Sequence, residues 1–161
     1  MRFLISALVL LMILGCESGD ASGSTQVSQE LADKAYALAQ QGKVHQLRTL
    51  LEENPELANA PVDRGTALLE IVVDIRPEFP AMHQTIEVLL LAGADPNLGA
   101  PEILRVAIWR GDPEALALLL KYGADPLIVS EKKKMNMLEY ARALGDERLI
   151  AIVDEWEAKK K

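Results

Sequence analysis

One short stretch occurs twice in this chain and limits its fold more than any other feature. Residues 89–96 are Leu-Leu-Leu-Ala-Gly-Ala-Asp-Pro, and residues 118–126 are Leu-Leu-Leu-Lys-Tyr-Gly-Ala-Asp-Pro. The two Gly-Ala-Asp-Pro tetrapeptides lie 30 residues apart. A leucine run followed by glycine and proline is typical of a helix end, because glycine forms a left-handed cap and proline prevents further helix. A helix end that recurs at such a spacing indicates a chain built from repeated units.

Apolar residues recur with helical periodicity over residues 30–158, between glycines and prolines that mark turns. In the most regular unit, Asp112 is the expected N-cap of a helix and Pro113 occupies its first turn. Thr66 is the expected N-cap of a helix in an earlier unit. The pattern predicts an all-α domain of helical hairpins, in approximate units 30–60, 61–98, 99–130 and 131–158.

These units resemble ankyrin repeats, which have a Gly-x-Thr-Pro-Leu opening, a glycine between two helices and a Leu-Leu-x-x-Gly-Ala-Asp ending. Equivalent helix positions at Ala35, Leu68, Leu104 and Leu138 are 33, 36 and 34 residues apart, against a family period of about 33. The first unit lacks the Gly-Ala-Asp ending, and the second carries about six extra residues between its helices. The resemblance implies an ankyrin-repeat solenoid of about four helical-hairpin repeats, a fold that binds other proteins.

The first fifteen residues have the character of an export signal. An apolar run from Phe3 to Leu14 follows Arg2, and as a helix it spans about 18 Å, short of the roughly 30 Å bilayer core. The run ends in Gly15-Cys16, which resembles a bacterial lipoprotein signal. The resemblance implies that residues 1–15 are removed and that Cys16 carries the lipid. The alternative is an ordinary cleaved signal peptide in which Cys16 is incidental.

A polar segment, residues 16–29, separates this signal from the helical units. It is rich in serine and glycine, so we expect a flexible tether. In lipoproteins of two-membrane bacteria an aspartate directly after the lipidated cysteine favours retention at the inner membrane. Glu17 stands there, so the periplasmic face of the outer membrane is the expected location.

The composition disfavours several classes of function. A formal net charge of −7 repels phosphate backbones, so nucleic acid is not an expected partner. No catalytic residue set, cofactor motif or metal site is expected, and the protein is predicted not to be an enzyme. His45 and His83 are expected to be solvated helix residues without carboxylates at ligand spacing. Asp95 and Asp125 are expected to stabilise loops at helix ends.

Protein-binding candidates come from the variable positions of the resembled family, which are the loops between units and the ends of the first helices. Trp109 and Arg110 form the most suggestive pair, because both residue types are enriched at interface hot spots. The alternative is that Trp109 packs on the neighbouring unit. Phe79, between two prolines in the insertion, is a further candidate, and its alternative is a local plug. Arg64 and Asp74 complete the set of expected contacts.

The expected function is that of a membrane-tethered periplasmic protein-binding module, monomeric and anchored by lipid. A narrower expectation is an immunity protein that neutralises a toxin delivered into the periplasm, since an acidic binder suits a basic toxin. The alternatives are an accessory factor for a periplasmic stress-response enzyme, or a structural envelope protein. Neighbouring genes distinguish the first two, and a structural protein predicts no partner in a pull-down.

We predict that Cys16→Ser releases the protein from membranes or leaves it unprocessed, because lasting attachment requires acyl chains on this residue. Membrane fractionation and the size of the mature protein measure the outcome. Unchanged membrane association with normal maturation would contradict the lipoprotein assignment.

Overall fold

The computed structural model describes residues 28–63, 65–74, 81–131 and 134–160. The predicted signal peptide and nearly all of the tether lie outside these ranges. So do the candidate residues Cys16, Arg64 and Phe79. Gln29, expected to end the tether, is instead the first residue of a helix.

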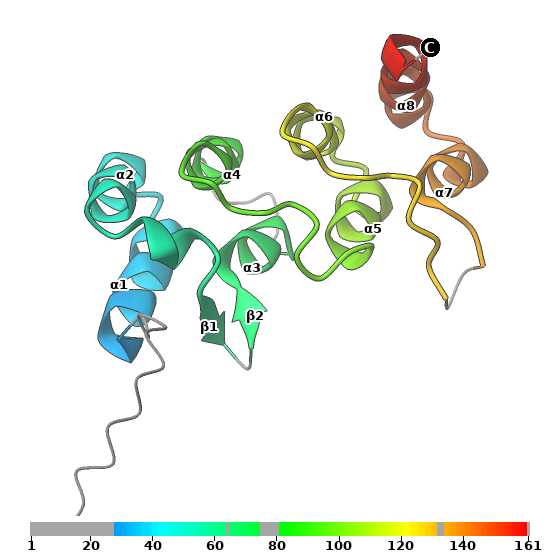
Figure 1. The fold of residues 1–161 in the computed structure, drawn as a ribbon. Coiled ribbons are helices and arrows are strands. Elements are labelled where there is room, and N and C mark those ends of the chain that lie inside the picture. The colour runs from blue at the N-terminus through cyan, green and yellow to red at the C-terminus, as the bar shows by residue number, and fades with distance from the viewer. Residues whose placement is uncertain (1–27, 64, 75–80, 132–133, 161) are drawn as a thin grey trace, which may run out of the picture.

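Paired helices make up most of the described chain, which confirms the all-α prediction. The helices pack in four antiparallel hairpins: α1 with α2, α3 with α4, α5 with α6, and α7 with α8. Figure 1 shows the odd-numbered helices in one row and the even-numbered helices in a second row. The helices are α1 Gln29–Gln40, α2 Val44–Glu53, α3 Leu68–Asp74, α4 Met82–Leu91, α5 Glu102–Trp109, α6 Pro113–Lys121, α7 Met137–Leu144 and α8 Glu147–Lys160.

The two rows share one hydrophobic core. Helices α1, α3, α5 and α7 contact one another in sequence, and α2, α4, α6 and α8 do the same. The core cluster runs without interruption from α1 to α8, and α6 contributes the fully buried Leu116 and Leu119. Each pair therefore removes from water the apolar faces of its neighbours.

Helix starts follow the local sequence closely. The Asp112 carboxylate accepts a hydrogen bond from the backbone N of Ala115 at 3.0 Å, and Pro113 occupies the first turn of α6. Both features confirm the prediction. Helix α7 begins with a capping box, in which Asn136 and Glu139 each accept a hydrogen bond from the other's backbone N at 2.9 Å.

The two Gly-Ala-Asp-Pro segments end α4 and α6 in the same way. Gly93 and Gly123 have left-handed φ values of 91° and 97°, and the following alanines donate backwards across the last turn. These bonds join the N of Ala94 to the O of Leu89 at 3.0 Å, and the N of Ala124 to the O of Leu119 at 2.9 Å. The geometry is that of a Schellman motif, which requires glycine or a similarly permissive residue.

The aspartate of each segment then fixes the chain that leaves the helix. Asp95 accepts a hydrogen bond from the backbone N of Asn97 at 2.8 Å, and Asp125 accepts one from the N of Leu127 at 2.9 Å. The prediction that these aspartates stabilise loops is confirmed.

An asparagine side chain joins each of these turns to the preceding unit. The Asn59 amide donates to the O of Gly93 at 2.8 Å and accepts from the N of Asp95 at 2.7 Å. One unit later, Asn97 donates to the O of Gly123 at 3.0 Å and accepts from the N of Asp125 at 2.8 Å. We call this pair of hydrogen bonds the asparagine clamp.

A small hairpin between the first two units is absent from the sequence prediction. Strand β1 (Pro61–Asp63) pairs antiparallel with β2 (Thr66–Ala67). Thr66 was expected to be the N-cap of the next helix, and that prediction is wrong. It lies in β2, and Ala67 separates it from α3, because pairing with β1 holds this segment extended.

We predict that Asn97→Ala lowers the free energy of unfolding by about 1–3 kcal/mol, since each of its two hydrogen bonds contributes about 0.5–1.5 kcal/mol. Urea denaturation followed by circular dichroism measures the change. The matched control is Leu127→Ala at the equivalent position one unit later, where the change is expected within about 0.5 kcal/mol. Equal losses in both variants would contradict the role assigned to the clamp.

Candidate protein-binding surface

The predicted binding residues that the structure describes gather where α3 and α5 end. Asp74 is the last residue of α3, Trp109 is the last residue of α5, and Arg110 caps α5. The two helices are neighbours in the odd-numbered row (Figure 1). Residues that are 35 and 36 positions apart in the sequence therefore share one edge of the molecule.

Arg110 ties the end of α5 to the end of α3. Its Nη2 donates to the backbone O of Asp74 and also to the Asp74 carboxylate, the latter at 3.0 Å. Only 17% of the Arg110 side chain is exposed. Its buried Nε has no hydrogen-bond partner among the residues that the structure describes. The guanidinium thus serves first to hold two neighbouring helices together, and a direct contact of Arg110 with a partner stays a prediction.

Trp109 projects from this fixed edge into solvent. It keeps 63% of its surface exposed, which does not fit the alternative that it packs on the neighbouring unit. Leu144, which precedes Gly145 as Arg110 precedes Gly111, is 46% exposed at the end of α7. Exposed large apolar side chains therefore end two successive helices of the odd-numbered row.

Two further carboxylates, Glu70 and Glu102, lie in the first turns of α3 and α5, at the opposite ends of these helices from Asp74 and Trp109. Burial raises the pKa of Glu70 above its usual range, and the negative charges of Glu102 and Asp74 raise it further. The Glu102 carboxylate also accepts a hydrogen bond from Nε of Arg105 at 2.5 Å. Two arginines and three acids thus lie along α3 and α5, and the negative charge is the larger.

His83 has neighbours that the sequence prediction missed. Its Nε2 lies 2.9 Å from the Asp112 carboxylate, and its Nδ1 lies 3.2 Å from Glu114. The side chain is 31% exposed, so the expectation of a solvated residue without carboxylate neighbours is wrong. The partners are 29 and 31 residues away along the chain and meet His83 only because α4 packs on α6. His45, in contrast, is exposed as predicted.

The described residues show no arrangement for metal chemistry. Within them, no three His, Cys, Asp or Glu side chains lie close enough together to hold an ion. None of the described helices has both the length and the apolar character that a membrane span needs.

The sequence matches no model of a protein family. A search among curated proteins also returned no match.

We predict that Glu70→Gln stabilises the protein increasingly as the pH rises from below 4.5, the ordinary value for this carboxyl group. The raised pKa means that the folded state binds the Glu70 proton more tightly than the unfolded state, so ionisation at higher pH costs stability. Glutamine cannot ionise and removes this cost. Urea denaturation of both proteins at several pH values between acid and neutral measures the difference.

A double-mutant cycle provides the control for this prediction. Glu102→Gln removes one of the charges that raise the Glu70 pKa, so the benefit of Glu70→Gln at neutral pH should shrink in that background. A benefit that is the same at every pH would point to packing rather than charge and would contradict the electrostatic explanation.

Proposed function

We propose that the described domain is an ankyrin-repeat solenoid of four helical-hairpin repeats. Three features support the assignment: helices paired in two rows, equivalent glycine caps at the ends of α4 and α6, and the asparagine clamp that recurs between turns. The sequence resemblance to ankyrin repeats covers the same helices. Residues 30–158 then form one binding domain behind a lipid-bearing tether at Cys16.

We further propose that this domain is a non-enzymatic protein-binding module, held at the periplasmic face of the outer membrane. The exposed Trp109 is the observation that carries the proposal. A tryptophan contributes a large apolar surface with few rotatable bonds, and interface hot spots are enriched in this residue. The bonds of Arg110 to Asp74 hold the backbone beside Trp109, so less conformational freedom is lost on binding.

The charge of the chain favours a basic protein as the partner. The net charge is −7. On the two helices that present Trp109, three carboxylates outnumber two arginines, and Arg105 and Arg110 pair with two of the three. Opposite charge speeds the encounter with a basic surface and disfavours acidic competitors. A basic toxin that enters the periplasm fits this chemistry, and the protein would act as its immunity factor.

We predict that Trp109→Ala weakens binding to the partner at least about 30-fold, which corresponds to a hot-spot loss of about 2 kcal/mol. The partner is first captured from envelope extracts with the mature protein and identified by mass spectrometry, and its affinity is then measured by calorimetry. The control is Leu91→Ala, which removes a similarly exposed side chain (62%) from α4 in the other row.

Two outcomes would contradict the proposal. Capture of no specific partner by the unmodified protein would favour a structural role in the envelope. Equal affinities of the Trp109→Ala and Leu91→Ala variants would remove Trp109 from the binding surface.

A further inference from the structure

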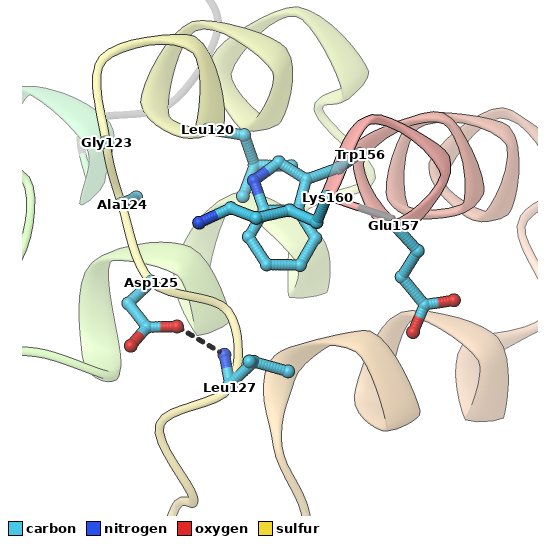
Figure 2. Close-up of a pocket in the computed structure, with 8 residues that line it drawn as sticks. All are labelled: Leu120, Gly123, Ala124, Asp125, Leu127, Trp156, Glu157 and Lys160. Atoms are coloured by element: carbon cyan, nitrogen blue, oxygen red, sulfur yellow. Dashed lines mark hydrogen bonds between the residues drawn. The ribbon is translucent and has the colours of Figure 1, made fainter.

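A hollow of about 540 Å³ lies at the C-terminal end of the even-numbered row, between the turn after α6 and the last turns of α8. Figure 2 shows the Trp156 indole beside Leu120, with Leu127 at the edge of the hollow. Ala124 and Leu120 form its buried wall, and Asp125, Glu157 and Lys160 supply polar groups.

The hollow exists because the last unit does not repeat the turn of the earlier ones. Helices α6 and α8 begin 34 residues apart, so Glu157 occupies the position that corresponds to Gly123. Without a glycine there, α8 continues to Lys160. Within the described residues, the turn that would pack beside residues 123–127 is therefore missing, and its space is open.

The residue at the edge of this space also differs from its equivalent in the earlier unit. Leu127 follows the second Gly-Ala-Asp-Pro segment as Asn97 follows the first. Asn97 clamps the next turn, but in the part of the chain that the structure describes α8 continues where such a turn would stand beside residue 127. Leu127 is instead 54% exposed and contributes an apolar wall. The hollow thus accepts an aliphatic chain better than it accepts polar backbone.

A cation already occupies the face of the indole. The Lys160 ammonium lies 5.1 Å from the centre of the Trp156 ring, and its aliphatic stem crosses the indole on the side of Asp125 (Figure 2). A cation over a tryptophan face is stabilised by the ring quadrupole. One Asp125 oxygen accepts from the N of Leu127, and the aspartate side chain is exposed at the rim.

The other carboxylate that lines the hollow, that of Glu157, is already paired with an arginine. Glu157 accepts a hydrogen bond from Arg142 at 2.6 Å, and Asp154 shares that guanidinium at the same distance. Asp125 is therefore the carboxylate that remains to attract a cation in the hollow. Its charge, the indole face and the apolar walls together suit a long aliphatic chain that ends in an ammonium group.

We propose that this hollow binds a lysine side chain of the partner protein, and that Lys160 takes its place while the protein is free. The inference rests on the proposed protein-binding function, and it assigns a second contact, at the opposite row from Trp109. The incoming lysine displaces Lys160 from the indole, lays its methylene groups against Leu127 and places its ammonium beside Asp125.

The test uses N-acetyl-lysine methylamide as a probe, with N-acetyl-norleucine methylamide as the analogue that keeps the four side-chain carbons and lacks the ammonium group. The full chain has two tryptophans. The test protein carries Trp109→Phe, so that the fluorescence comes from Trp156 and reports binding in the hollow. Lys160→Ala is expected to bind the lysine probe about two- to fivefold more tightly, because the competing cation over the ring is gone.

Matched variants separate the contributions. Lys159→Ala is the control, since Lys159 pairs with Glu155 at 2.7 Å, and it should leave the affinity unchanged. Asp125→Asn keeps an acceptor for the N of Leu127 but removes the charge, so it should weaken binding of the lysine probe. Proton NMR of Trp156→Leu should show no binding while circular dichroism shows a folded protein.

Three results would overturn the inference: equal affinity for the lysine and norleucine probes, equal effects of Lys159→Ala and Lys160→Ala, or no binding by a folded Lys160→Ala variant. The probe experiment requires neither the partner nor Trp109, so its result is independent of the proposed function. If a captured partner depends on Trp109 but binds the Trp156→Leu variant normally, the second contact fails and the binding role stands.

Discussion

The array depends on hydrogen bonds between successive helix-ending turns. Burial of apolar surface is non-directional and by itself does not set how far one helix pair lies from the next. The asparagine clamp is directional, because one amide satisfies both a carbonyl and an N–H group of the following turn. Asn59 and Asn97 make these bonds with nearly the same lengths, so two successive junctions share one geometry.

The fourth helix pair lacks this constraint. At residue 127 leucine replaces asparagine, and at residue 157 glutamate replaces the glycine that would stop a helix. Helix α8 therefore runs on instead of turning, and Arg142 bonds to Asp154 and Glu157 on its surface. Charged side chains on an outer helix surface are typical of the capping units of stacked arrays. The hollow beside Trp156 results from this ending.

Regular spacing also places the candidate binding residues. Because α3 and α5 are held in register, the Asp74 backbone and carboxylate lie within reach of Arg110. The bonds occupy Arg110 and leave Trp109 exposed beside it. Arg110 thus stabilises the edge from which Trp109 projects, and the two members of the Trp-Arg pair have different structural roles.

The sequence by itself determined what depends on local chemistry. The helix ends at Gly93 and Gly123, the cap at Asp112 and the all-α class followed from residues a few positions apart. Tertiary structure decided the contacts between residues about 26 to 36 positions apart, which include both asparagine clamps and the carboxylates beside His83. It also decided that Trp109 is exposed. These contacts depend on how one helix pair stacks on the next. Thr66 shows the same limit, since strand pairing prevailed over its preference for a helix cap.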